Sequence, residues 1–240
     1  NSQRMVIGMG KTGLSCMRFL CARGERPLWF DTRQEPPGLA DIRREFPEIP
    51  LHCGPLDAAL LCGAQEIVVS PGVSLQEPAL VAAAAAGVAL IGDIELFVRA
   101  TAKPVLAITG SNAKSTVTTL VGEMAAACGL RAGVGGNLGT PVLDMLAQDA
   151  DTDCYVLELS SFQLETTHSL RAAVAVILNI SEDHMDRYAD LAHYVMAKQR
   201  IHSSAANIVV NRADHWTQPV TAGAASLWSF GLDDGGERAV

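Results

Sequence analysis

The sequence predicts an α/β protein made of two domains, the first with a parallel sheet over residues 1–92 and the second over residues 93–240. Strand-like apolar runs alternate with helical patterns along the whole chain, which is typical of strand–helix–strand units. Glycine-containing turns join a strand to a helix at two places, residues 8–13 and 109–116. Between them a short helical segment over residues 92–104 ends in a proline, and we expect the domain boundary there.

In the first domain the expected elements follow from apolar runs and from the residues that stop them. A short strand runs into glycines, and the helix after it is closed by Gly24. The next strand ends at Asp31, while Pro78 and Gly87 suit the first turn and the end of an alanine-rich, well-packed helix. The expected strands are residues 4–10, 27–31 and 66–73, and the expected helices are residues 12–24 and 77–88.

The second domain continues this alternation of strands and helices. It ends in a turn-like tail over residues 231–240 with no element after it, so the sheet looks unfinished and we expect the domain to be incomplete. Its expected strands are residues 105–109, 154–159, 173–180, 207–211 and 226–230, and its helices begin at Lys114, near Val142, near Leu191 and near Asp214.

Composition and charge exclude several classes of function. With 49% hydrophobic and 18% charged residues the chain is an ordinary globular protein, and its net charge of -8 argues against a nucleic-acid binder, which usually has a basic face. No apolar run reaches the ~18 residues of a membrane span, and no signal peptide is visible. The six cysteines form no C-x-x-C pair, which indicates a reduced compartment, and we expect the cytoplasm.

The first candidate site is the G-x-G-x-x-G pattern at residues 8–13, which has a strand before it and a helix after it. Glycines let a phosphate approach the backbone, and the helix amino terminus supplies free N–H groups and a positive dipole end. Asp31 ends the next strand, where it would accept a hydrogen bond from a ribose hydroxyl. Thr12, Thr32 and Arg33 add polar groups around the same crevice. These features predict a Rossmann-like site with NAD as the first ligand to consider, and a tight turn without a ligand is the alternative.

The second candidate site is a variant phosphate-binding loop, or P-loop, over residues 109–116. Ile108 and Ala113 occupy the two glycine positions of the general pattern G-x-x-x-x-G-K-[ST]. Lys114 would pair with β- and γ-phosphate oxygens, Ser115 would bind Mg²⁺, and the loop N–H groups would cradle the phosphates. If Ala113 needs a positive φ, the strain is roughly 1–2 kcal/mol, which leaves the phosphate ligands in place. The alternative is a lysine that merely begins a helix.

Acidic residues and a histidine follow two later strands. Glu158 stands at the carboxyl end of a strand beside the loop, where a metal ligand is expected. Asp183 and His184 follow the next strand; such a pair is more often solvated, but its place after a strand of the same sheet favours a functional role. Lys198 lies on a helix, and nothing in the residues alone distinguishes it from a surface lysine.

Several motifs, in one order and spacing, resemble the Mur ligase family. They are TGSNAKST at residues 109–116, GVGGNLGTP at 133–141, VLELSSFQLE at 156–165, NISEDHMDRY at 179–188 and the lysine of MAKQRI at 198. The resemblance runs from Val6 to about Gly231. The segments GDIELF and DTR…PPG narrow it to the members that join D-glutamate to UDP-N-acetylmuramoyl-L-alanine. Each motif alone would be weak, and their shared order makes the resemblance specific.

The resemblance implies an ATP-dependent ligase of peptidoglycan synthesis in the bacterial cytoplasm. ATP would phosphorylate the carboxylate of UDP-N-acetylmuramoyl-L-alanine, and the amine of D-glutamate would attack the acyl phosphate to form an amide. ATP with Mg²⁺ at two sites fits the need to neutralise phosphoryl charge. We expect no nucleic-acid or membrane partner, and we expect a monomer.

The resemblance also assigns roles to individual positions. Lys114, Lys198 and His184 would be catalytic, with Lys198 carbamylated so that it can help to hold metal. The ATP site would comprise Thr109, Gly110, Ser111, Asn112, Ala113, Lys114, Ser115 and Thr116. The metal ligands would be Ser115, Glu158, His184 and Lys198. The substrate residues would be Lys11, Thr12, Asp31, Thr32, Arg33, Gly72, Asn137, Ser160, Gln163 and His184. The early glycines would then serve uridine diphosphate rather than NAD.

Two departures from the family pattern matter. Ala113 replaces the usual glycine, and we expect a loop that still works with slight strain. Family members have three domains, so the D-glutamate-binding carboxyl-terminal domain and part of the central one would be absent, and we expect no turnover by this chain alone. The alternatives are an NAD-linked oxidoreductase, which leaves Lys114, Glu158 and His184 without a role, a P-loop ATPase without ligase chemistry, and a non-catalytic nucleotide-binding module.

Overall fold

The computed structural model describes residues 3–148, 151–220 and 225–232. Its residues separate by contact into two units. The first unit comprises residues 1–97 with 141–147, and the second comprises residues 98–140 with 148–240. The division after residue 97 falls inside the helical segment at which the sequence predicts the domain boundary, and a boundary between residues 92 and 93 stays a prediction.

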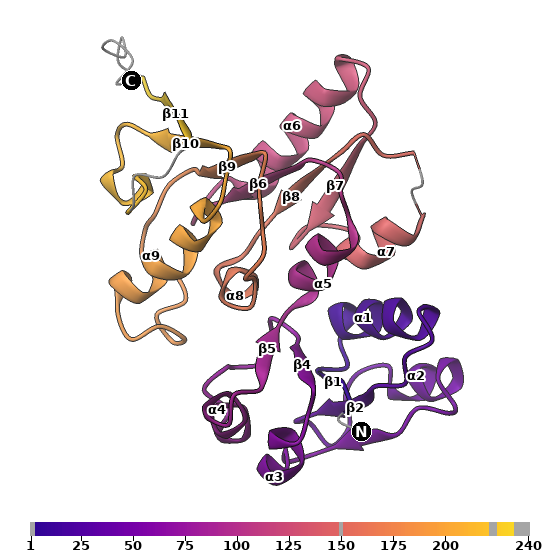
Figure 1. The fold of residues 1–240 in the computed structure, drawn as a ribbon. Coiled ribbons are helices and arrows are strands. Elements are labelled where there is room, and N and C mark those ends of the chain that lie inside the picture. The colour runs from indigo at the N-terminus through magenta and orange to yellow at the C-terminus, as the bar shows by residue number, and fades with distance from the viewer. Residues whose placement is uncertain (1–2, 149–150, 221–224, 233–240) are drawn as a thin grey trace. The chain divides into compact units, whose positions relative to one another are not determined.

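The first unit is built on a five-stranded sheet whose strands are all parallel (Figure 1). The strand order is β3-β2-β1-β4-β5, so the chain winds outward on both sides of β1. The carboxyl end of β1 is therefore the switch point at which such sheets bind ligands. The strands are β1 (Met5–Ile7), β2 (Leu28–Asp31), β3 (Leu51–Cys53), β4 (Glu66–Val69) and β5 (Ala89–Ile91). The helices are α1 (Lys11–Ala22), α2 (Leu39–Glu45), α3 (Ala58–Cys62), α4 (Pro78–Ala85), α5 (Asp93–Ala100) and, from later in the chain, α7 (Val142–Gln148).

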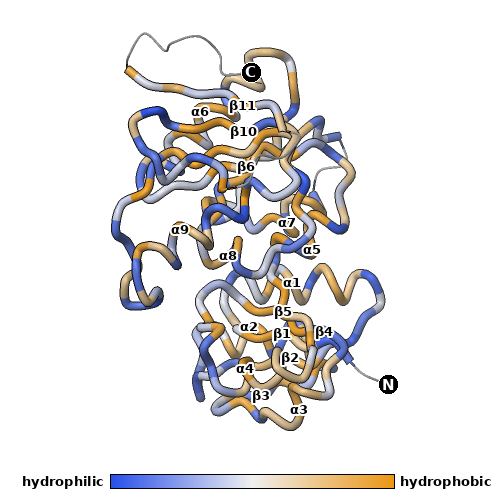
Figure 2. The backbone as a smooth tube through the Cα atoms, turned by 60° about the vertical axis from the view of Figure 1, so that its left-hand side comes forward, coloured by the Kyte–Doolittle hydropathy of each residue, from blue (hydrophilic) through white to orange (hydrophobic). Residues whose placement is uncertain are grey.

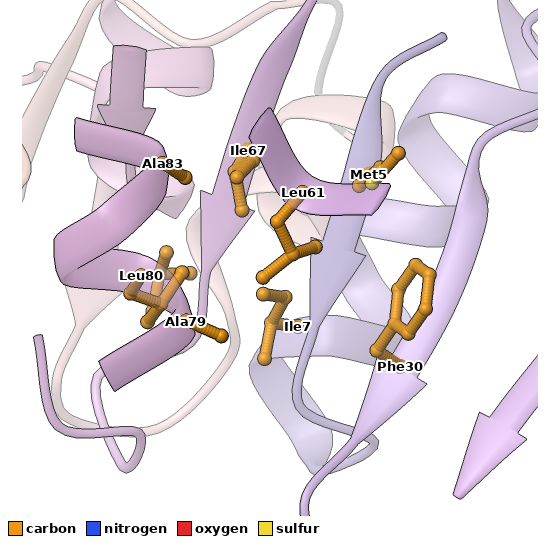
Figure 3. Close-up of a cluster of buried hydrophobic side chains, with 9 residues drawn as sticks. Met5, Ile7, Phe30, Leu61, Ile67, Ala79, Leu80 and Ala83 are labelled. Atoms are coloured by element: carbon orange, nitrogen blue, oxygen red, sulfur yellow. The ribbon is translucent and has the colours of Figure 1, made fainter. Parts of the chain in front are cut away.

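The core of the first unit lies between this sheet and the helices α3 and α4. Figure 3 shows Met5 and Ile7 of β1 and Ile67 of β4 grouped with Leu61 of α3 and Leu80 of α4. All five side chains are at most 3% exposed, and burying a side chain of this kind stabilises the fold by about 1.5–3 kcal/mol. The alanine run forms α4, with its buried alanines in this core, so the well-packed helix expected from the sequence is confirmed.

The second unit contains a six-stranded sheet, again wholly parallel, in the order β11-β10-β9-β6-β8-β7. Its central strand β6 lies between β8 and β9, so the segments that follow these three strands meet at one edge of the sheet. The strands are β6 (Val105–Thr109), β7 (Ala132–Gly136), β8 (Cys154–Glu158), β9 (Val174–Ile177), β10 (Asn207–Asn211) and β11 (Ser226–Phe230). The helices are α6 (Lys114–Ala127), α8 (Ser161–Glu165) and α9 (Leu191–Gln199), with 3-10 turns η1 (Arg200–His202) and η2 (His215–Thr217).

Helices cover both faces of this second sheet. Figure 1 shows α6 on one face and α8 and α9 on the other, and Figure 2 shows hydrophobic residues along the strands between them. On the α6 face, Val117 and Val121 of the helix pack with Ile108 of β6 and Val156 of β8. Strands covered on both faces are nearly continuous in apolar residues, which is why the sequence predicts them well.

The elements that the sequence does not predict have local causes. Three glycines weaken the strand pattern of β7, which forms because it pairs with β8. Gly136, with φ +106°, lies so close to that strand that an added Cβ would be 2.3 Å from the Glu158 carbonyl oxygen. The helix expected near Asp214 is wrong, because Asp214 caps only the three-residue turn η2. The sequence also does not predict the short elements β3, β5, α2, α3 and α8. Residues 233–240 of the expected tail lie outside the described residues.

The cysteines are distributed over both units. All six cysteines are free; Cys16 and Cys154 are buried, and Cys128 is exposed just after α6. Within the described part of the chain, every helix is too short or too polar to span a bilayer.

Candidate phosphate-binding site

The loop that joins β6 to α6 has the backbone geometry of a phosphate-binding turn. Ala113, the residue before the helix, is left-handed with φ 64° and ψ 7°, which is the positive φ considered from the sequence. It costs about 1–2 kcal/mol relative to an ordinary conformation. No side chain caps the amino terminus of α6, and Ser115 and Thr116 in its first turn are exposed. The first N–H groups of the helix are therefore available to an anion.

Buried hydrogen bonds tie this loop to the ends of the neighbouring strands. Thr109 is fully buried, and its hydroxyl donates to the carbonyl of Leu159 after β8 at 2.7 Å. The Ser111 hydroxyl donates to the Ser181 carbonyl at 3.0 Å and lies 3.1 Å from the Tyr194 hydroxyl. The loop is thus held by the segments after β8 and β9 and by α9.

Lys114, Ser115, Glu158 and Asn137 form the polar centre beside the loop. The Ser115 hydroxyl donates to Glu158 Oε2 at 2.6 Å, and the Asn137 amide donates to Glu158 Oε1 at 2.8 Å. Glu158 ends β8 and is only 2% exposed. Lys114 Nζ donates to the carbonyl of Ser111 at 3.0 Å, so this ammonium group lies over its own loop. The structure brings Ser115, Asn137 and Glu158, from three separate segments of the sequence, together at the edge where the strands end.

Lys198 is buried directly beneath the loop. It is 1% exposed, and its Nζ donates to the Gly110 carbonyl at 2.9 Å and to the Thr109 hydroxyl at 3.3 Å. The same Nζ lies 4.6 Å from the centre of the Tyr194 ring. Burial, and then the charge of Lys114, lower the pKa of Lys198 to about 7, against the opposing charges of two carboxylates. Much of this amine is therefore uncharged at neutral pH, a property that the sequence pattern does not reveal.

His184 lies in an aromatic cluster. It has a positive φ of 56°, its ring lies 4.9 Å from that of Phe162, and its Nε2 lies 3.6 Å from Asp183 Oδ2. Phe162 stacks on Tyr188 at 5.8 Å, and Tyr188 contacts Tyr194 edge-on at 5.3 Å. The aromatic rings thus connect His184 to the loop indirectly. Among the described residues, no group of three or more His, Cys, Asp or Glu side chains is gathered as a metal cluster.

Ser160 and Gln163 are engaged with each other at the start of α8. The Ser160 hydroxyl accepts from the Gln163 N–H at 3.2 Å, and the Gln163 side chain accepts from the Ser160 N–H at 3.1 Å. This reciprocal capping box stabilises the first turn of the helix. It also fixes the direction in which the chain leaves β8 after Glu158.

In the first unit, the glycine turn after β1 is shaped by one close contact. Gly13 packs onto the turn so tightly that an added Cβ would lie 1.8 Å from the Gly8 carbonyl oxygen. In contrast, an added Cβ at Gly10 or Gly72 would meet no atom within 4 Å. Lys11 is exposed and Thr12 half-buried at the start of α1. The turn therefore leaves room for a ligand beside the helix amino terminus.

Asp31 is not a free acceptor in this structure. The carboxylate is 2% exposed and accepts from the Met9 N–H at 2.7 Å, the Arg33 N–H at 2.9 Å and the Arg33 guanidinium at 2.7 Å. Burial alone would raise the pKa of Asp31, but these hydrogen bonds, led by that of the Arg33 side chain, outweigh it and hold the pKa below its usual value. Arg33 and Thr32 are exposed, so a ligand could reach them first.

Comparison with known proteins finds two family matches along the chain. Residues 2–92 match the family described as Mur ligase MurD-like, N-terminal domain, and residues 108–239 match the Mur ligase middle domain. The UDP-N-acetylmuramoylalanine--D-glutamate ligase of Pseudomonas aeruginosa is 57% identical over 96% of this chain and 51% of its own length. The enzyme of that name from Marinobacter nauticus is 51% identical over 95% of this chain and 51% of its own length. The chain spans about half the length of the curated relatives it matches.

Solved structures share the fold at low sequence identity. One is UDP-N-acetylmuramate:L-alanyl-gamma-D-glutamyl-meso-diaminopimelate ligase from Neisseria meningitides, with a TM-score of 0.59 and 17% identity over 95% of this chain and 78% of that chain. Another is UDP-N-acetylmuramate-alanine ligase from Thermotoga maritima, with a TM-score of 0.52 and 18% identity over 97% of this chain and 53% of that chain. The α/β class with parallel sheets is thereby confirmed. Since the middle-domain match alone covers more than half of the 240 residues, the chain belongs to the Mur ligase family.

Proposed function

We propose that this chain is part of an ATP-dependent ligase that joins D-glutamate to UDP-N-acetylmuramoyl-L-alanine in the cytoplasm of a bacterium. The identity of 57% with a ligase of that name supports the substrate pair. The observation that carries the chemistry is the junction of Ser115, Glu158 and Asn137 beside the amino terminus of α6. In the reaction, the substrate carboxylate takes the γ-phosphoryl group of ATP. The amine of D-glutamate then attacks the acyl carbonyl, and phosphate leaves.

The second domain, residues 93–240, would bind ATP through the loop of residues 109–116. Free N–H groups and the positive end of the α6 dipole favour phosphate oxygens. Lys114 would exchange the Ser111 carbonyl, its present partner at 3.0 Å, for β- and γ-phosphate oxygens. An ammonium group gains more from a charged phosphate than from a neutral carbonyl, so this exchange is favourable.

The donor set beside the loop fits Mg²⁺. The Ser115 hydroxyl and the Glu158 carboxylate are oxygen donors already 2.6 Å apart, and Mg²⁺ prefers such hard ligands. The ion would neutralise phosphoryl charge when bound. Glu158 Oε2 would bind the ion instead of accepting the hydrogen bond from the Ser115 hydroxyl. The Asn137 amide, 2.8 Å from Glu158 Oε1, would keep the carboxylate oriented.

His184 and Lys198 would serve a second ion and the reacting end of the substrate. An ammonium group cannot bind a cation, but a neutral amine can form a C–N bond to CO₂ and release one proton to become an anionic carbamate. Because the pKa of Lys198 is about 7, the neutral form needed for this addition is well populated at physiological pH. Ser160, Gln163 and Asn137 would line the path of the substrate, with the capping box fixing the backbone around Ser160.

The first domain, residues 1–92, would hold the uridine diphosphate group. The carboxyl end of β1 is the switch point of its sheet, and the α1 amino terminus beside Lys11 and Thr12 suits a diphosphate. The loop of residues 31–33, facing the same sheet edge, and Gly72 would contact the nucleoside. We also propose that the protein is a monomer. Most of its D-glutamate site would lie outside these residues.

A thermal-shift titration tests the choice of ligand. We expect UDP-N-acetylmuramoyl-L-alanine to raise the melting temperature of the first unit, since a ligand that binds only the folded state stabilises it by mass action. NAD is the control and should leave the melting temperature unchanged. Stabilisation by NAD alone would overturn the proposal in favour of the Rossmann oxidoreductase.

Replacing Glu158 with glutamine tests the metal site. We expect the Glu158→Gln variant to bind MgADP at least about tenfold more weakly, because a neutral amide is a poor ligand for Mg²⁺. Isothermal titration calorimetry should show a much smaller loss of affinity for ADP in the absence of Mg²⁺. Glu123→Gln, at an exposed position on α6, is the matched control. Equal weakening with and without Mg²⁺ would contradict the assigned role.

A further inference from the structure

We propose that Asn179 is a positioning residue that holds the phosphate loop in its strained conformation. Asn179 follows β9 by two residues. Its side-chain amide forms hydrogen bonds with both the N–H and the carbonyl of Asn112 in the loop. Its Oδ1 accepts from the Asn112 N–H at 2.8 Å, and its Nδ2 donates to the Asn112 carbonyl at 3.1 Å. This paired contact joins two segments that lie 67 residues apart in the sequence.

The place of this contact decides its effect. The Asn112 carbonyl belongs to the peptide that leads into Ala113, the left-handed residue with φ 64°. Fixing the N–H and the carbonyl of Asn112 therefore fixes the entry into the strained residue. An alanine has no intrinsic preference for this conformation, whereas a glycine adopts it freely, so the chain needs an outside restraint at this point.

The backbone of Asn179 completes the restraint. Its carbonyl accepts from the Ser111 N–H at 2.9 Å, and an added Cβ at Gly110 would lie 3.4 Å from that carbonyl oxygen. Two consecutive loop residues, Ser111 and Asn112, are thus hydrogen-bonded to this one asparagine, and Gly110 has little space for a side chain beside it. The loop then delivers Lys114 and the first N–H groups of α6 to the phosphates, so the inference rests on the nucleotide role proposed above.

A role in general stability is distinguishable from this positioning role. Asn179 is half-buried and Asn112 is exposed, so solvent can replace the two side-chain bonds with little effect on global unfolding. Asn207, the first residue of β10, makes a similar bond just before the start of β9, its Nδ2 donating to the Ala173 carbonyl at 2.9 Å. Asn207→Ala is therefore a matched control that removes an amide from the sheet but leaves the loop alone.

The experiment compares the Asn179→Ala and Asn207→Ala variants by two measurements. Amide hydrogen exchange in the ligand-free chain should become faster over residues 110–115 in Asn179→Ala and stay unchanged there in Asn207→Ala. Titration with MgADP should show roughly tenfold weaker binding for Asn179→Ala, and a change within about twofold for the control. Wild-type exchange and wild-type affinity in Asn179→Ala would overturn the inference.

A second substitution separates strain from other causes. In the Asn179→Ala background, Ala113→Gly should restore most of the MgADP affinity, because glycine needs no restraint to adopt a positive φ. Loss of affinity without this rescue would overturn the inference, since the asparagine would then act in some other way. Failure of the wild-type chain to bind MgADP, with the exchange differences present, would overturn the nucleotide role while supporting the restraint.

Discussion

The free energy of unfolding of the wild-type chain will increase between pH 7 and pH 9, because Lys198 loses its proton in the folded state. The Lys198→Met variant will lack most of this increase. In the folded chain the pKa of Lys198 is about 7, whereas a lysine in an unfolded chain has a pKa of about 10.4. Below pH 7 both states carry the proton, and the folded state bears the full cost of a buried charge. Between the two pKa values only the unfolded state carries it, so folding becomes more favourable as pH increases.

The expected size of this effect is on the order of 2–3 kcal/mol over two pH units, since each unit is worth about 1.4 kcal/mol. Urea unfolding at pH 7, 8 and 9 measures it as the difference between wild type and Lys198→Met. Cys16 and Cys154, whose pKa values burial raises, also affect stability near pH 9, but they are present in both proteins and their effect cancels in the difference. Lys103→Met, at an exposed position, is the control. A difference that stays constant with pH would contradict the prediction.

Gly13→Ala will destabilise the first unit by about 3 kcal/mol or more. Gly13 lies in the first turn of α1, where alanine would normally be favoured by about 1 kcal/mol. Here the new Cβ would lie 1.8 Å from the carbonyl oxygen and 2.9 Å from the carbonyl carbon of Gly8. Both are backbone atoms, so no side-chain rotation relieves the overlap and the turn itself must move.

Gly10→Ala is the matched control for this prediction. Gly10 has φ -94° and no atom within 4 Å of an added Cβ, so alanine fits there without strain. Urea unfolding should separate the two variants, since only Gly13→Ala forces the turn to move. MgADP binding by the second unit should persist in both. A Gly13→Ala variant as stable as wild type would show that the turn tolerates the displacement.

The sequence predicts the central strands of the two sheets because these buried strands are apolar along most of their length. It also predicts the two turns that carry candidate ligands, since the spacing of glycines, Lys114 and Ser115 reflects local geometry. It does not predict β7, whose glycines have meaning only beside Glu158. Short-range pattern fails there because the cause is a close approach between strands.

The candidate site is less readable from sequence than the fold. Lys198 looks like an ordinary helical lysine until the structure buries it under Gly110. Asn179 and Tyr194 carry no signal of their own, although Asn179 lies within one of the family motifs. Their contacts with the loop span 67 and 83 residues, distances over which residue periodicity carries no information. Only the resemblance to a family pointed to Lys198 in advance.

The order of strands in the second sheet has a consequence for the synthesis of the chain. The Thr109 hydroxyl donates to Leu159, which lies 50 residues later in the sequence. The Ser111 hydroxyl donates to Ser181, which lies 70 residues later. Ribosomes add roughly 5–20 residues per second, so the partners of the loop are made several seconds after the loop itself. Until β8 and β9 are made, β6 lacks both of the strands with which it pairs. The phosphate loop can therefore become ordered only after the segment that reaches Ser181 has been made.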